Sequence, residues 1–180
     1  MRVLKEAETR KVFEKLAKFM GDKLFSLLDR PDGKHCFRLV NQKVYYCRED
    51  LAKIASCVPK KNVVAMGVLL GKFTKGDNFR LYATATDLLA QHGKHKVWLR
   101  QPGEQSFLYG NHVVKRHLGR VTEDTAQNQG VVVLNMNDIP LGFGVTAKST
   151  ADMRGALSEA TVVIHQADTG EYLRSQNEMC

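Results

Sequence analysis

The pattern of the sequence changes at Gly93-Lys94, and this change constrains the fold more than any other feature. Before it, an amphipathic helix, strand-like runs and short helices alternate; after it, short strands follow one another with dense turn signals. A chain of 180 residues is long enough for one large domain or two small ones. We therefore predict two domains, residues 1–93 and 94–174, followed by a C-terminal tail, residues 175–180.

The first half combines helical and strand patterns. Apolar residues repeat at three- and four-residue spacing over Glu6–Met20, and Gly21 supplies a stop, so we predict a helix there. We predict a hairpin whose strands are joined by the turn Asn41-Gln42. The remaining expected elements are a helix at about Glu49–Cys57, strands at Val63–Phe73 and Phe79–Ala83, and a helix at Thr86–Gln91. These elements favour a mainly antiparallel sheet with flanking helices, and hence an α+β protein.

The second half is expected to be mostly strands. Gly130–Asn135 is the strongest strand pattern, and we expect Phe143–Lys148 to pair with it across the turn Asn137-Asp138-Ile139-Pro140. The other predicted elements are a strand at Val97–Leu99, a loop that can include a helical turn at Pro102–Tyr109, a basic strand at Val113–Val121, a short helix at 150–157, and a last hairpin of Thr161–His165 and Glu171–Leu173 around Gly170.

Charge is unevenly divided between the halves. Residues 1–94 carry 19 Lys+Arg against 10 Asp+Glu, or +9, whereas residues 95–180 carry 8 against 9, or −1. The whole chain has a formal net charge of +8 at pH 7. A basic balance of this size favours a polyanionic partner or an acidic surface.

Several functional classes are disfavoured by the motifs. The cysteines form no C-x-x-C pair, there is no apolar signal segment, and the longest apolar run, Val63–Leu70, is too short to span a bilayer. We therefore expect an intracellular protein with free thiols and no membrane association. Gly142–Ala147 matches G-x-G-x-x-A, but a Pro-containing turn precedes it and β-branched residues follow, so we interpret it as a structural turn.

We also expect no metal, no cofactor and no catalytic residue. Four histidines cluster within 26 residues, but no cysteine or H-E-x-x-H spacing accompanies them, and neighbouring cations would repel a dication. A polar surface is the preferred interpretation of the cluster, which comprises His92, His95, His112 and His117.

The predicted basic strand Val113–Val121 is the clearest candidate for a binding surface. Period two would put Lys115 and His117 on one side of it and Arg116 and Arg120 on the other. Cations in such a row could follow the phosphates of a nucleic acid. Lys and Arg also protect edge strands from aggregation, and the strand alone leaves both interpretations open.

Three runs of the second half resemble a PUA domain: Gly119–Val121, Gly130–Asn135 and Asp138–Gly144. In that fold a G-V-V-V strand and a P-L-G-x-G turn form part of a compact pseudo-barrel. Upstream, Lys96–Leu99 and Phe107–Val113 look like its first strand and its helix-to-glycine loop.

The resemblance extends over the whole chain. The PUA likeness covers about residues 94–173, while Thr9–Phe19 and the ending His165–Arg174 match a single two-domain family. That family is the two-domain PUA factor of large-ribosomal-subunit biogenesis, the "nuclear import protein seven" family. The resemblance implies an α+β fold in which an N-terminal α/β domain is followed by a C-terminal PUA pseudo-barrel.

The resemblance also implies a function. It implies a monomeric, non-catalytic factor of the nucleus and nucleolus that is required for pre-rRNA processing and 60S subunit assembly. Its partners would be pre-ribosomal RNA, pre-60S particles and other ribosome-biogenesis proteins, the latter bound through residues 1–93. By position, the RNA-binding residues would be Gly110, Asn111, Lys115, Arg116, Arg120, Lys148 and Arg174.

Two alternatives stay open at this point. An RNA-modifying enzyme could carry a PUA accessory domain, but residues 1–93 would then have to hold a cofactor loop or a catalytic acid, and we find neither. A protein-interaction scaffold whose basic charge is incidental is the other alternative, and the salt dependence of RNA binding distinguishes it from an RNA-binding factor.

Overall fold

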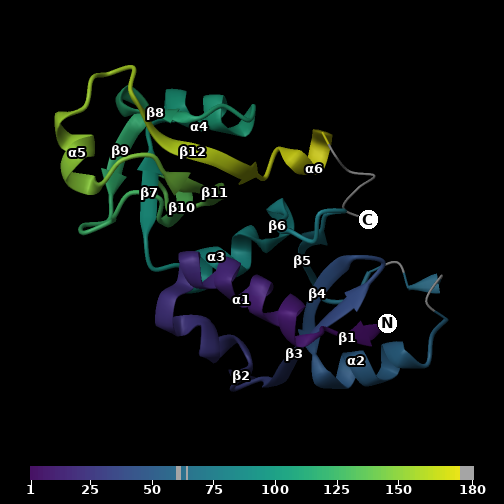
Figure 1. Ribbon diagram of the computed structural model, residues 1–180. Coiled ribbons are helices and arrows are strands. Elements are labelled where there is room, and N and C mark those ends of the chain that lie inside the picture. The colour runs from purple at the N-terminus through teal and green to yellow at the C-terminus, as the bar shows by residue number, and fades with distance from the viewer. Residues whose placement is uncertain (60–61, 64, 175–180) are drawn as a thin grey trace.

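The computed structural model describes residues 1–59, 62–63 and 65–174 (Figure 1). The described chain forms two sheets, one from the strands before Gly93 and one from the strands after it. The predicted tail, residues 175–180, lies outside the described residues. None of the described helices is both long and apolar enough to cross a membrane.

The first half is a twisted antiparallel sheet with helices on both faces. Its strands are β1 (Arg2–Val3), β2 (Asp29–Arg30), β3 (Gly33–Val40), β4 (Lys43–Arg48), β5 (Val68–Phe73) and β6 (Phe79–Leu81). They lie in the order β1-β3-β4-β5-β6, with β2 paired to β3, and every pairing is antiparallel. The helices are α1 (Glu6–Met20), α2 (Glu49–Ser56), α3 (Thr86–His92) and the 3₁₀ helices η1 (Gly21–Leu27) and η3 (Ala83–Ala85).

Helix α1 forms where its apolar spacing predicts. Val12, Leu16 and Phe19 are buried on one face, and Gly21 ends the helix with a φ of +56°. At its start, Glu8 accepts hydrogen bonds from the Arg2 guanidinium at 2.5 and 2.7 Å and from the Lys5 N–H at 2.7 Å. The hydrogen-bonded Arg2 guanidinium is the main reason that the pKa of Glu8 is lowered to about 2. Glu8 thereby connects β1 to the first turn of α1.

The predicted hairpin of the first half is also confirmed. Asn41 and Gln42 have φ of 48° and 66°, and the register runs from Val40 opposite Lys43 outward. The expected strand at Val63–Phe73 begins later, at Val68, because Met66 and Gly67 form an irregular approach to it. Val64 lies outside the described residues.

The second half is a six-stranded sheet that curls on itself. Its strands are β7 (Lys96–Leu99), β8 (Val113–Val114), β9 (Leu118–Val121), β10 (Gly130–Asn135), β11 (Pro140–Thr146) and β12 (Thr161–Asp168), in the order β8-β12-β11-β10-β7-β9. The helices are α4 (Gln101–Leu108), α5 (Thr150–Gly155), α6 (Glu171–Arg174) and the 3₁₀ helix η4 (Lys115–His117). Because η4 alone joins the two edge strands β8 and β9, the sheet must bring its edges together, as a barrel does.

The structure differs from the predictions for three segments of the second half, besides the basic strand Val113–Val121. Pro102–Tyr109 is more helical than the predicted loop with one helical turn: α4 runs to Leu108, and Pro102 is tolerated in its first turn, where the missing N–H costs no hydrogen bond. The P-L-G-F-G run is not a turn but strand β11, which begins at Pro140, and its glycines admit the close approach of β12. The last hairpin is instead one long strand, β12, followed by the short helix α6.

Strand β10 is buried on both faces, which explains its unbroken apolar sequence. Val131 and Val133 point into the barrel and join a core with Val97 and Phe107. The alternate residues, Val132 among them, point the other way and belong to the core of the first half.

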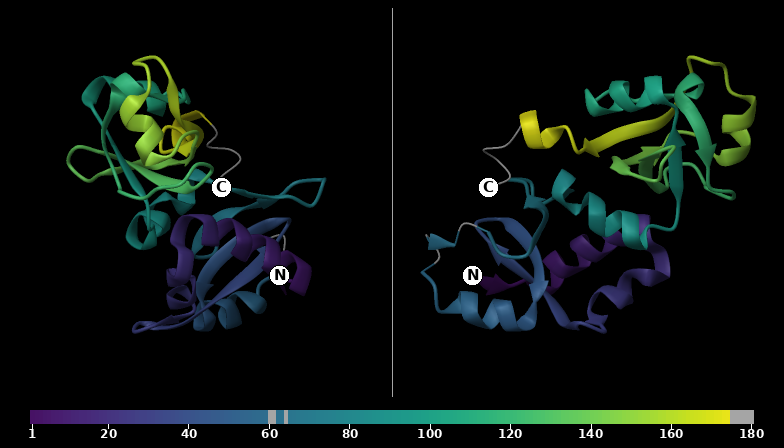
Figure 2. Two further views of the ribbon diagram at one scale, coloured as in Figure 1. Left: turned by 60° about the vertical axis from the view of Figure 1, so that its left-hand side comes forward. Right: turned by 180° about the vertical axis from the view of Figure 1, so that it is seen from behind.

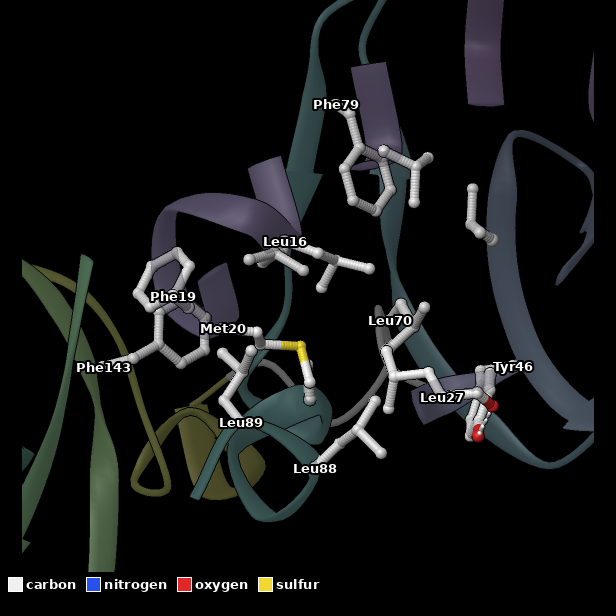
Figure 3. Packing of buried hydrophobic residues seen from close by; sticks show 14 of the residues in the cluster. Leu16, Phe19, Met20, Leu27, Tyr46, Leu70, Phe79, Leu88, Leu89 and Phe143 are labelled. Carbon is white, nitrogen blue, oxygen red and sulfur yellow. Dashed lines mark hydrogen bonds between the residues drawn. The ribbon is translucent and has the colours of Figure 1, made fainter. Parts of the chain in front are cut away.

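The two halves therefore meet through apolar packing. Phe19 of α1 packs edge to face against Phe143 of β11, with ring centroids 5.4 Å apart (Figure 3). The buried residues that the second half contributes to this core are Val132, Leu134, Phe143 and Ala167. In both views of Figure 2 the two lobes lie together along α1 and α3. Whether the halves fold independently on either side of Gly93 stays a prediction.

Candidate nucleic-acid interface

The loop after α4 is the first part of the site. Gly110 has a φ of +89°, a left-handed conformation that favours glycine, and its N–H donates to the Phe107 carbonyl at 2.9 Å. No other atom lies within 4 Å of the position that a Cβ would occupy. Backbone conformation rather than crowding therefore requires glycine here, and the turn presents Tyr109 and Asn111 to solvent.

A buried carboxylate organises the elements that support this loop. Asp168, at the end of β12, is completely buried, and its Oδ2 lies 2.6 Å from His165 Nε2 and 2.7 Å from Arg174 Nη2. Arg174 Nη1 also donates to the Leu108 carbonyl at the end of α4. The guanidinium is thus engaged by Asp168 and Leu108, and it joins α6, β12 and α4 in one network.

His165 connects this network to the loop after α4. Its ring packs on Phe107 of α4 with centroids 4.9 Å apart, and its backbone N–H donates to His112 Nδ1 at 3.2 Å. His112 and Asn111 are both exposed. Sequence reasoning assigned no role to His165 or Asp168, since only the turn back of α6 brings Arg174 to them.

A surface hollow of about 560 Å³ lies beside this network, between α4 and α6. Tyr109, 71% exposed, and Leu173, 89% exposed, line it together with Arg174. An exposed ring next to a glycine turn is the kind of side chain on which an unstacked base can pack. Tyr109 is a third residue that sequence reasoning missed, although its place before Gly110-Asn111 was a usable signal.

Lys115 and Arg116 lie at the other end of α4. They belong to η4 rather than to a strand, so the period-two arrangement predicted for Val113–Val121 is wrong. The η4 backbone N–H groups of these residues donate to the carbonyls of Ala160 and Ser158, which breaks the strand. Arg116 is exposed and forms an ion pair with Glu159 at 2.8 Å.

Arg120 and Lys148 are placed elsewhere. The Arg120 guanidinium lies over the Trp98 ring, 4.9 Å from its centroid, and the Trp98 indole N–H donates to Asp138 at 2.6 Å. Lys148 is half-buried in the bend before α5. The structure therefore brings Gly110, Asn111 and Arg174 together at one end of α4, Lys115 and Arg116 at the other, and separates the last two predicted residues.

The clustered histidines do not form one polar surface. His95 is buried and lies 3.1 Å from the Thr125 hydroxyl, and burial lowers the pKa of both His95 and His92. The surface interpretation is wrong for His95, because its side chain is buried against Thr125, while the His92 side chain is half-buried. Across residues 1–59, 62–63 and 65–174, no group of three or more His, Cys, Asp or Glu side chains is arranged to hold a metal ion.

Two family models match the chain. Residues 95–177 match the model described as the UPF0113 PUA domain, and residues 1–82 match the NIP7/UPF0113 pre-PUA domain. The Schizosaccharomyces pombe 60S ribosome subunit biogenesis protein nip7 is 51% identical over 179 residues, which cover 99% of each chain. The Pongo abelii 60S ribosome subunit biogenesis protein NIP7 homolog is 55% identical with the same coverage.

Solved structures of low identity share the fold. A PUA domain structure from Aeropyrum pernix has a TM-score of 0.63 at 13% identity and covers 99% of this chain and 90% of its own. A hypothetical protein from Pyrococcus horikoshii has a TM-score of 0.62 at 11% identity and covers 99% of both chains. The predicted PUA pseudo-barrel is thereby confirmed. Because both halves match family models and the full-length relatives are more than half identical, the chain belongs to the NIP7/UPF0113 family, as its motifs predicted.

Proposed function

We propose that this protein is an RNA-binding assembly factor that acts without catalysis in pre-rRNA processing and 60S ribosomal subunit biogenesis. The observation that carries the proposal is its 51–55% full-length identity to relatives named 60S ribosome subunit biogenesis proteins. The protein would act as a monomer in the nucleus and nucleolus. Its partners would be pre-60S particles and other biogenesis proteins, the latter bound through residues 1–93.

The RNA would bind the second half along α4. At one end of the helix, the Gly110 turn exposes the Tyr109 ring for base stacking and the Asn111 amide for base edges. At the other end, Lys115 and Arg116 supply cations for phosphates. Single-stranded RNA is commonly recognised by this combination of stacking, edge contacts and charge.

The remaining proposed residues would act differently. The Arg174 guanidinium is held by Asp168 and Leu108, so we assign it to positioning the glycine loop as well as to the charge of the face. Arg120 and Lys148 lie on other elements, where they would contact flanking nucleotides.

The experiment replaces both cations of η4. At about 0.15 M salt each phosphate contact contributes about fourfold to affinity, so Lys115→Ala with Arg116→Ala should weaken binding of a mixed-sequence single-stranded RNA about tenfold. The slope of log affinity against log salt should flatten by about 1.4, or about 0.7 per contact. Glu159→Gln, which frees Arg116 from its ion pair, should instead tighten binding. Fluorescence anisotropy titrations at several salt concentrations measure all three.

A matched control removes the same charge elsewhere. Arg10→Ala with Lys53→Ala takes two exposed cations from the first half, and its affinity and slope should stay near wild type. In cells, depletion should leave unprocessed pre-rRNA and fewer 60S subunits, and the Lys115/Arg116 variant should rescue poorly. Loss of one nucleotide modification, restored by wild type but not by a point variant in residues 1–93, would instead identify an RNA-modifying enzyme.

A further inference from the structure

Three cations of the first half gather where it meets strand β12. Lys15 and Lys18 lie one turn apart on α1, and Arg80 lies on the edge strand β6. The Lys15 ammonium reaches across to the second half and donates to the Gln166 side-chain carbonyl at 3.2 Å. We call Lys15, Lys18 and Arg80 the junction cluster.

The junction cluster differs from other cations of the first half in its lack of ion pairs, although Glu171 lies within electrostatic range of Arg80. One turn earlier on α1, Lys11 forms an ion pair with Asp77. Among the described residues, by contrast, no carboxylate forms an ion pair with any member of the junction cluster. Burial lowers the pKa of Lys15, and the positive charges of Lys18 and Arg80 lower it further.

Crowded like charges weaken a fold, and a counter-charge from a bound ligand would relieve that repulsion. A polyanion that covers the cluster would supply that charge and release its own condensed cations. The cluster is also open to a ligand: Lys18 and Arg80 are exposed, as are Ile164 and Gln166 on the adjoining face of β12.

The cluster lies next to the network beside α4, because Gln166, which accepts from Lys15, follows His165 directly on β12. Glu171 of α6 lies close enough to both Arg80 and Arg174 to feel their charges, and it accepts a hydrogen bond from the Ala83 backbone of η3. Helix α6 therefore spans from the Arg174 network to the β6 edge of the first half, where Figure 1 shows it above β6. RNA leaving the glycine loop along α6 would meet Arg80 and then Lys15.

We propose that the RNA site extends beyond the PUA domain, across α6, onto Lys15, Lys18 and Arg80 of the first half. This inference rests on the proposed RNA-binding function and adds a second contact surface to it. The junction cluster binds phosphates, while Gln166 and Ile164 of β12 line the path between the halves. An acidic protein segment is less well matched, because the cluster lies next to the proposed RNA face of the second half.

RNA length separates the two surfaces. A single-stranded RNA of about six nucleotides should engage the face around α4 alone, and one of about 20 nucleotides should reach both, since two further contacts are worth about tenfold at about 0.15 M salt. Lys15→Gln with Arg80→Gln should therefore weaken binding of the longer RNA about tenfold and lower its salt slope by about 1.4, with the shorter RNA unaffected. Glu171→Gln should tighten binding of the longer RNA, because it removes a negative charge beside Arg80.

Thermal unfolding checks that the Lys15/Arg80 variant folds as wild type does. Removal of crowded like charges should leave the Tm of the Lys15/Arg80 variant at or above that of wild type. Arg10→Gln with Lys53→Gln is the control of equal charge loss and should bind both RNAs as wild type does. If that control weakens binding equally, or if the Lys15/Arg80 variant keeps wild-type affinity and slope, the extension is wrong.

The two proposals fail in different ways. Normal binding of the shorter RNA, with no effect of Lys15→Gln and Arg80→Gln on the longer one, would overturn the extension and leave the proposed function intact. Failure of wild type to bind either RNA would overturn both.

Discussion

Residues 1–93 and residues 94–174 complete their hydrophobic cores in different ways. The second half has a core of its own inside the curled sheet, where Phe107 and Met153 are fully buried. The core of the first half lies between α1 and the sheet of that half, and side chains of β10, β11 and β12 complete it. The first half thus has a hydrogen-bonded sheet of its own, but its hydrophobic packing depends on side chains of the second half.

The largest expected effect comes from separating the halves. A fragment of residues 94–180 keeps its inner core and should give a dispersed NMR spectrum at low concentration. A fragment of residues 1–93 loses four buried apolar partners and should give a collapsed spectrum. A dispersed spectrum for residues 1–93 would contradict the comparison, and collapsed spectra for both fragments would indicate one inseparable unit.

A smaller effect comes from one side chain of the shared core. Phe143→Ala removes the ring that packs on Phe19, and buried Phe→Ala changes cost about 3–5 kcal/mol of unfolding free energy. Combined with Phe19→Ala, it should show a coupling energy of about 0.5–1.5 kcal/mol for the edge-to-face pair. Urea unfolding of the single and double variants measures both quantities.

Met153 provides the matched control for that cycle. It is fully buried in the core of the second half, so Met153→Ala should also destabilise, by about 2–5 kcal/mol. Its coupling with Phe19→Ala should be near zero, because distant sites add independently. Equal coupling of Phe19 with Phe143 and Met153 would mean that the cores are not distinct.

The smallest effect belongs to a surface contact of the first half alone. Glu8→Gln removes the carboxylate that pairs with Arg2, and because this ion pair lies at the surface we expect the smallest loss of unfolding free energy of the series. The pKa of Glu8 falls from 4.5 to about 2 on folding, so its stabilisation is present above pH 4.5 and is lost as pH falls toward 2. The unfolding free energies of wild type and variant, measured in urea, should therefore converge as pH falls over that range. A constant difference between them would show that ionised Glu8 is not the source of the stabilisation.

Local patterns predicted the first half well. The spacing of Val12, Leu16 and Phe19 determined α1, and the pair Asn41-Gln42 determined the hairpin, because both signals act over a few neighbouring residues. The first half nonetheless depends on distant residues for packing, and no local pattern of its own could reveal that Phe143 covers Phe19.

The second half misled local reasoning where distant contacts decide the structure. Lys115 and Arg116 leave the strand conformation because their N–H groups pair with carbonyls more than 40 positions later. Pro102 and Gly103 suggested a loop with one helical turn at most, yet Gly103 is needed so that α4 can lie close to His117. Of the candidate site, the Gly110 turn was predictable from its residues, whereas the bond of Arg174 to Asp168 depends on how α6 folds back.

The chain positions of the residues that form the shared core also affect how the protein folds during its synthesis. Val132, Phe143 and Ala167 lie late in the chain, so a growing polypeptide must expose the apolar side of α1 and α3 until these residues leave the ribosome. The first half would be synthesised early and completed late. Slow translation after residue 93 would prolong this exposure, and with it the time in which the nascent chain needs protection from aggregation.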